Sequence, residues 1–159
     1  MADLSVVKET TYQQLLAEHR ELRRATGGLR AFLEGPRPDP GAAGALDWAT
    51  DLSRRLVDLH AQLAVHFREE ETTELFPALT AAFPQTASEV REFAVQHRLM
   101  LGELRTALTE VLRFAEALPD SGSGLRRRLQ HLLGRLAEHE AAETDLIQRL
   151  SCQDYGPAD

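Results

Sequence analysis

The chain has 159 residues, of which 43% are hydrophobic and 27% charged, a composition that fits one soluble domain with a single core. Its formal net charge of −7 argues against nucleic acid or an anionic membrane as the main partner. The single cysteine excludes an internal disulfide. There is neither a secretion signal at the start nor an apolar run long enough to cross a bilayer, so we expect a cytoplasmic protein.

Proline and glycine divide the chain into four long segments. The breaks are the three-proline stretch at residues 35–41, a short connection from 77 to 84, and a Ser/Gly-rich stretch at 119–124. Strand signals are absent, whereas leucine recurs at steps of three and four. We predict one all-α domain over residues 1–159, with helices at roughly 4–34, 45–76, 85–118 and 124–150 and a short polar tail at 151–159. Long helices with short connections favour an antiparallel up-down-up-down four-helix bundle.

The second and fourth segments carry the same pattern, in which a leucine stripe is continued by His-x-x-x-Glu. The stripe consists of Leu52, Leu56, Leu59, Leu63, His66 and Glu70 in one segment, and of Leu129, Leu132, Leu136, His139 and Glu143 in the other. Residues four apart lie on one face of a helix, so each His-Glu pair is expected to face the core. A buried carboxylate without a partner is rare and costly, which argues against chance at two matching positions.

The first and third segments each add one histidine, His19 and His97, inside a leucine-rich run. Counting residues back to the breaks places all four histidines within about two turns of one another along the bundle, close enough to share one layer. Four imidazoles and two carboxylates in one layer make a nitrogen and oxygen shell for two transition-metal ions. The predicted metal ligands are His19, His66, Glu70, His97, His139 and Glu143. Without metal, one of the two buried carboxylates is expected to keep a proton, with a raised pKa.

Other polar residues are expected to be less informative. Because their helical phase differs from the stripe, we expect Glu69, Glu71, Glu74 and Glu140 to lie on the solvated flank of their helices. His60 and His131 are expected at the surface, Tyr12 in the core, and Cys152 without a specific role.

Several alternative chemistries fail on spacing. No histidine has a glutamate three residues before it, as the ferritin-type di-iron bundle requires. The zinc-protease motif His-Glu-x-x-His is absent, because His139 and Glu140 are followed by Glu143 where a histidine would be needed. The sequence also has no glycine-rich phosphate loop, cysteine-rich zinc pattern or nucleophile elbow.

The full set of motifs resembles the haemerythrin-like domain with the HHE cation-binding motif. EHREL at residues 18–22 and QHRLM at 96–100 are similar to the family's first- and third-helix signatures. EE at 70–71 followed by LFP at 75–77 is similar to its second-helix ending, and the resemblance covers residues ~10 to 150. It implies a bundle that holds two non-haem iron ions bridged by an oxo or hydroxo group. Each iron would take two histidines, and the two glutamates would bridge.

Two departures from the family pattern bear on function. Leu101 stands where oxygen-carrying haemerythrins have a further histidine, which favours reactive or sensing chemistry over oxygen transport. LFP also begins one residue later after His66 than is usual, so either a π-bulge absorbs the extra residue or Glu71 replaces Glu70 as the bridge. We keep Glu70, because it matches Glu143.

Three functions follow in order of preference. The first is a di-iron protein that binds or senses O2, NO or peroxide. The second is a di-iron enzyme, with peroxidase-, catalase- or oxidase-like activity or iron donation in iron-sulfur cluster repair. The third is a helical interaction module without metal.

Overall fold

The computed structural model of the protein describes residues 4–72, 75–117 and 124–153. It has four long helices, α1 (Leu4–Glu34), α2 (Ala45–Thr72), α4 (Ala87–Ala115) and α5 (Leu125–Gln153). A short helix α3 (Leu75–Ala82) and a 3₁₀ turn (Pro84–Thr86) connect α2 to α4. The described residues contain no strand, and the predicted all-α class is confirmed. None of the described helices is apolar over a length that would span a membrane.

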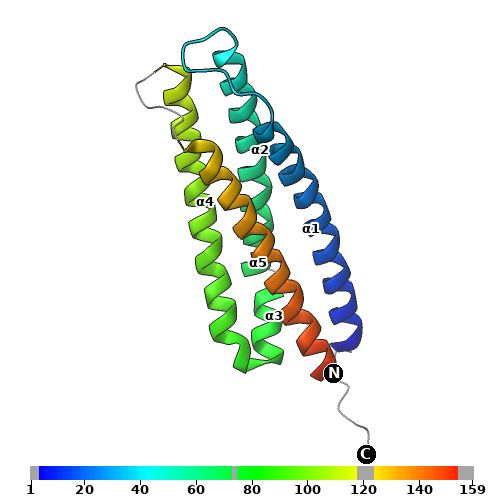
Figure 1. The fold of residues 1–159 in the computed structure, drawn as a ribbon. Coiled ribbons are helices and arrows are strands. Elements are labelled where there is room, and N and C mark those ends of the chain that lie inside the picture. The colour runs from blue at the N-terminus through cyan, green and yellow to red at the C-terminus, as the bar shows by residue number, and fades with distance from the viewer. Residues whose placement is uncertain (1–3, 73–74, 118–123, 154–159) are drawn as a thin grey trace, which may run out of the picture.

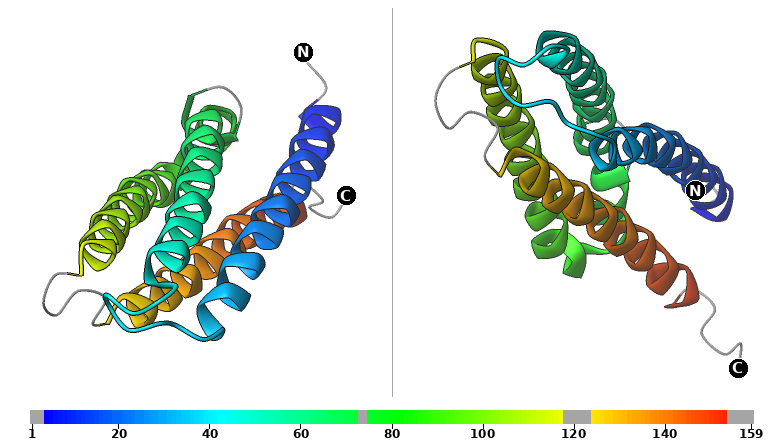
Figure 2. Two further views of the ribbon diagram at one scale, coloured as in Figure 1. Left: turned by 90° about the horizontal axis from the view of Figure 1, so that it is seen from above. Right: turned by 45° about the horizontal axis from the view of Figure 1, so that its top comes forward.

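The four long helices alternate in direction, so the predicted up-down-up-down bundle is also confirmed. In Figure 1, α1 rises from the N-terminus, α2 descends, α4 rises and α5 descends. Each long helix packs against two others: α1 against α2 and α5, and α4 against the same two helices. The views in Figure 2 show this ring of four helices from above and at a tilt.

A glycine directly precedes two of the long helices. Gly44 precedes α2 with φ of 82° and Gly124 precedes α5 with φ of 74°, in the left-handed region that other residues rarely adopt. The carbonyl of each accepts a bond from the backbone N–H four residues on, at 2.9 Å. These glycines therefore set the direction in which α2 and α5 enter the bundle.

The segment between α2 and α4 differs from the prediction. The second helix was expected to reach residue 76 and the stretch 77–84 to be a plain connection, but α2 ends at Thr72 and α3 begins at Leu75. Pro77 is the third residue of α3, in the first turn, where its missing N–H is not needed. Leu75 and Phe76 are buried, so α3 closes one end of the bundle instead of merely linking two helices.

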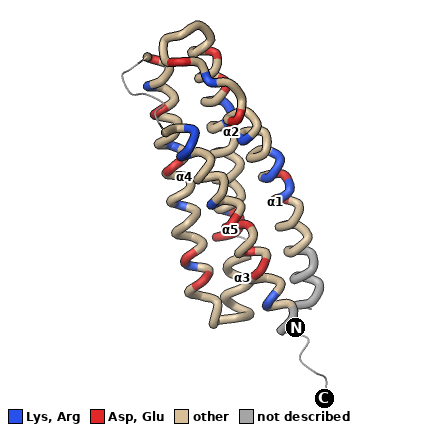
Figure 3. The backbone as a smooth tube through the Cα atoms, viewed as in Figure 1, with Lys and Arg blue, Asp and Glu red and all other residues tan. Residues whose placement is uncertain are grey.

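The core consists of two apolar clusters stacked along the bundle. The larger one extends from Leu22 and Phe67 toward the α1–α2 loop, and the smaller one joins Leu15, Leu146 and their neighbours to α3. Between them every long helix contributes a buried polar residue. Figure 3 shows Lys and Arg on α1 and at the start of α5, with others on α2, on α4 and near the end that α3 closes.

Candidate metal centre

All six predicted ligands lie in one buried layer between the two apolar clusters. We call this set the polar layer; their exposed fractions are 0% for His19, 5% for His66, 4% for Glu70, 1% for His97, 3% for His139 and 1% for Glu143. α2 and α5 each contribute a histidine and a glutamate one turn apart, and α1 and α4 each contribute one histidine. The apolar stripe of each helix therefore places its polar members at the same height, as the residue count predicts.

The polar layer divides into two overlapping groups that could each hold a metal ion. One group is His19, His66, Glu70 and Glu143, and the other is Glu70, His97, His139 and Glu143. Within each group one ligand atom per residue lies within 4.8 Å of all the others. Glu70 and Glu143 belong to both groups, and a carboxylate with two oxygens can serve two cations at once.

The Nε2 atoms of the histidines point at the two carboxylates. His66 Nε2 lies 3.0 Å from Glu70 Oε1, and His139 Nε2 lies 3.1 Å from Glu143 Oε1. His97 Nε2 is 3.4 Å from Glu70 Oε2 and 3.5 Å from Glu143 Oε1. His19 Nε2 is 3.4 Å from Glu143 Oε2. All four imidazoles thus converge on the same small volume.

Most of the inward-facing ligand atoms of this layer lack a hydrogen-bond partner, the exception being the Nε2 atoms of His97 and His139, which lie 2.8 Å from each other. Both carboxylate oxygens of Glu70 and of Glu143, and the Nε2 atoms of His19 and His66, are buried without a hydrogen-bond partner. Leaving several buried polar atoms unsatisfied is expensive, and such groups need an explanation. Metal cations coordinated by imidazole nitrogen and carboxylate oxygen satisfy these atoms together, so the residues fit a metal centre.

Three of the four histidines are held by a hydrogen bond at Nδ1, on the far side of the ring. Glu18 Oε2 accepts from His66 and Glu71 Oε1 accepts from His97, both at 2.8 Å, and Gln96 Oε1 accepts from His139 at 2.7 Å. Such partners hold the ring orientation and favour the tautomer in which Nε2 has the lone pair that can bind a metal. These roles were not predicted from the sequence. The available signal was that each partner adjoins a predicted ligand in the chain.

The metal-free layer has strongly perturbed acid–base properties. Burial lowers the pKa of His66, but close contact with the Glu70 carboxylate, and the charges of Glu70 and Glu143, raise it to about 9. Burial also raises the pKa of Glu70. Burial acts the same way on Glu143, yet its close contacts with His139, His19 and His97 outweigh burial and hold that pKa well below the usual range. The two carboxylates are therefore unequal, and Glu70 has the higher pKa of the two.

Aromatic rings pack against the histidines of α4 and α5. The Phe67 ring stacks on His97 with centroids 3.8 Å apart and an interplanar angle of 3°, and Phe76 lies 5.6 Å away at 13°. Phe67 and Phe93 meet His139 edge-on at 5.7 and 5.3 Å. These contacts restrict the rotation of both rings.

Comparison with known proteins agrees with this arrangement. Residues 10–150 match the family model described as the Hemerythrin HHE cation binding domain. The chain belongs to this family. Searches of curated proteins and of solved structures found no significant match. The match covers most of the chain and confirms the resemblance, and domains of the HHE family bind metal cations.

The ending of α2 bears on the unusual HHE spacing. The described residues of α2 are α-helical throughout, without a π-bulge. Glu70 belongs to both candidate groups, whereas Glu71 points to the outer nitrogen of His97. The expectation that Glu71 is simply solvated was wrong, because its side chain is only 32% exposed and bonded to His97. Glu69 is exposed as predicted, and Glu74 lies outside the described residues.

Glu140 corrects a second prediction. It was expected on the solvated flank but is 3% exposed, and its carboxylate accepts a hydrogen bond from Arg23 Nε at 3.2 Å. Arg23 lies nearer the surface than the Glu140 carboxylate, since the Arg23 side chain is 59% exposed. The apolar stripe could not reveal this burial, because it depends on how closely α1 and α5 approach each other.

Arg23→Ala is therefore expected to destabilise the protein by about 1–3 kcal/mol, because it leaves the buried Glu140 carboxylate without its partner. Arg24→Ala is a matched control on the same helix, since the Arg24–Glu21 pair is exposed on both sides. Its effect should stay within ~0.5 kcal/mol. Urea unfolding of the metal-free variants measures both values, and equal losses would contradict the role given to Arg23.

The remaining predictions concern residues outside the polar layer. His131 is exposed as expected, whereas His60 is half-buried. Tyr12 is half-buried against the smaller apolar cluster, and its hydroxyl accepts a hydrogen bond from Gln148 at 3.0 Å. Leu101 packs against the larger cluster. The side chain of Cys152 lies outside the described residues.

Proposed function

We propose that this chain is a non-haem di-iron protein that binds or senses O2, NO or peroxide at the polar layer. The observation that carries the proposal is the sharing of Glu70 and Glu143 between two four-residue groups. Each group offers two imidazole nitrogens and oxygens from both carboxylates, a mixed set that suits iron. Membership in the HHE family supports a cation as the occupant.

In this proposal the chain's own residues hold and orient the irons. His19 and His66 would bind one ion, His97 and His139 the other, and Glu70 and Glu143 would bridge them. The outer hydrogen bonds from Glu18, Glu71 and Gln96 keep three of the imidazoles turned inward. When bound, the iron pair supplies the electron-transfer chemistry, and the protein supplies geometry and a dry surrounding.

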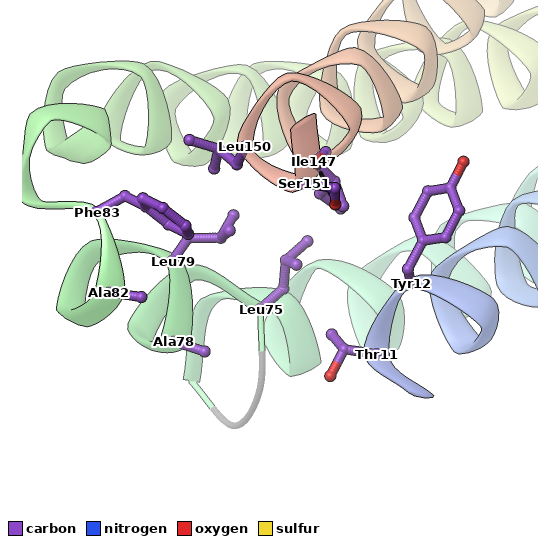
Figure 4. Close-up of a pocket in the computed structure, with 10 residues that line it drawn as sticks. All are labelled: Thr11, Tyr12, Leu75, Ala78, Leu79, Ala82, Phe83, Ile147, Leu150 and Ser151. Atoms are coloured by element: carbon purple, nitrogen blue, oxygen red, sulfur yellow. Dashed lines mark hydrogen bonds between the residues drawn. The ribbon is translucent and has the colours of Figure 1, made fainter. Parts of the chain in front are cut away.

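The surroundings of the layer suit a small, weakly polar ligand. Apolar clusters lie on both sides along the bundle. A pocket of about 70 Å³ lies at the end that α3 closes, with Leu75 and Leu79 of α3 facing Leu150 of α5 across it (Figure 4). Leu75 also lines a smaller cavity that reaches Glu70. Leu75 therefore lies between the pocket and the cavity that Glu70 lines.

The absence of a histidine at Leu101 leads to a specific expectation about oxygen. With only two imidazoles to hold each iron, the residues would leave more of each ion accessible to O2, so the diferrous protein should be oxidised by air instead of carrying O2 reversibly. Cycles of deoxygenation and reoxygenation, followed by absorption, test this. Full recovery of the starting spectrum over several cycles would contradict it.

The same absorption measurement separates this function from a metal-free interaction module. Protein loaded anaerobically with ferrous iron and then oxidised should gain near-ultraviolet absorption typical of a coupled ferric pair. The His97→Ala variant, folded by circular dichroism, should lose most of this signal. A wild-type protein that binds iron without any such absorption would rule out a coupled pair.

A further inference from the structure

Three of the four ligand histidines are held at Nδ1 by a side chain from the preceding long helix, in one repeating pattern. The fourth histidine lacks this hydrogen bond. Glu18, next to His19 on α1, holds His66 of α2. Glu71, next to Glu70 on α2, holds His97 of α4. Gln96, next to His97 on α4, holds His139 of α5. In each case the neighbour of one ligand supports the histidine of the next helix around the bundle.

The sequence repeat identifies the residue that would complete this pattern. The first half of the repeat comprises α1 and α2, and the second half comprises α4 and α5. Glu18 and Gln96 each stand directly before a ligand histidine, and Glu71 directly follows Glu70, the ligand glutamate of the first half. The corresponding residue of the second half follows Glu143 and is Thr144. Its hydroxyl donates to the backbone carbonyl of Glu140 at 2.9 Å, within its own helix. A threonine side chain is also much shorter than a glutamate.

His19 lacks the support that the other three histidines have. It is 0% exposed, and its Nδ1 is buried without a hydrogen-bond partner. The aromatic packing is unequal too, because the position that corresponds to Phe67, which stacks on His97, is Glu140. The ring of His19 instead meets the ring of His66 edge-on, with centroids 5.4 Å apart.

Resting on the proposed function, we infer that the two metal positions are inequivalent. The position at His19 and His66 is the exchangeable one, and Thr144 is the residue that makes it so. An outer hydrogen bond raises the basicity of a histidine ligand and fixes its ring, and losing such a partner costs 10–100-fold in metal affinity as an order of magnitude. The His97–His139 position has both outer bonds, whereas the His19–His66 position has one.

The surface beside the weaker position is suited to cation exchange. A groove of about 560 Å³ between α1 and α2 is lined by Glu18, Glu21 and Glu69 and reaches His66. The groove beside His139, between α4 and α5, is lined by Arg135 as well as Glu138. A divalent cation therefore meets a more acidic path at the His19–His66 position.

Release of ferrous iron to a coloured chelator under anaerobic conditions tests the inference. The wild-type protein should release its iron in two phases of equal amplitude, with rates at least ~10-fold apart. Thr144→Glu should slow the fast phase toward the slow one, because it supplies the acceptor that Glu71 supplies to His97. Thr106→Glu is a matched control, since Thr106 also donates to a backbone carbonyl four residues earlier on an exposed helix face.

A second variant covers the case in which Thr144→Glu does not fold. Gln96→Leu removes the outer bond of His139 and should speed up the slow phase while leaving the fast phase unchanged. A single release rate in the wild-type protein, or wild-type phases in folded Thr144→Glu, would overturn the inference while the di-iron proposal stands. A wild-type protein that takes up no iron would instead overturn both.

Discussion

Loading with ferrous iron is expected to raise the melting temperature of the wild-type protein and to leave that of a Glu70→Gln, Glu143→Gln double variant nearly unchanged. Both carboxylates belong to both candidate groups, and their four oxygens are buried without hydrogen bonds. Metal that binds only the native state adds its binding free energy to folding. The amide variants keep the size of the side chains but remove the charge that holds two cations together.

The size of this effect follows from ligand linkage. Two sites, each filled at a hundred times its dissociation constant, stabilise the native state by about 5 kcal/mol. In a chain of this length that corresponds to a rise of roughly 10–20 °C in melting temperature. Glu69→Gln with Glu138→Gln is a matched control, because these exposed residues lie on the same helices and lose the same charge. Equal melting shifts in the wild-type protein and in the Glu70, Glu143 variant would contradict the shared-carboxylate arrangement.

The metal-free protein should lose stability as the pH rises from 6.5 to 9. The pKa of His66 is about 9 in the native state against an ordinary value of 6.5, so the native protein holds a proton that the unfolded chain has released. The stabilisation that protonated His66 provides is fully present below pH 6.5 and is lost as the pH rises through 9. A difference of this size is worth about 3 kcal/mol.

Urea unfolding of the metal-free protein across this range checks the prediction. His66→Gln should flatten the pH dependence, whereas His131→Gln, at an exposed position on α5, should not. Metal competes with the same proton, so the stability gained on loading should grow with pH over this window. If the wild-type protein and His66→Gln show the same slope, the proton does not reside on His66.

The sequence predicts the polar layer because the layer continues the stripes that build the core. His66 and Glu70 lie in phase with the leucines of α2, and His139 and Glu143 lie in phase with those of α5, so helical periodicity alone turns them inward. His19 and His97 join them because four helices of similar length fix the height of every residue. The same helical periodicity therefore predicts both the fold and the candidate ligands.

The outer hydrogen bonds could not be predicted in the same way. Glu18, Glu71 and Gln96 are each a chain neighbour of a ligand, so their helical phase places them between the core and the solvent. Whether such a side chain reaches a histidine of the next helix depends on the distance between helices, which a periodic pattern does not contain. The burial of Glu140 and the separate helix α3 depend on packing between elements for the same reason.

The central claim is that six residues hold two metal ions between them, and a metal count tests it most directly. Wild-type protein loaded anaerobically with ferrous iron, then separated from free iron and analysed for iron and protein, should hold two ions per chain. His97→Ala, shown to be folded by circular dichroism, should hold markedly fewer ions. The substitution removes one ligand of the His97–His139 position and a side chain that contacts both Glu70 and Glu143. Folded wild-type protein that retains no iron would contradict the account, as would His97→Ala that still retains two ions per chain.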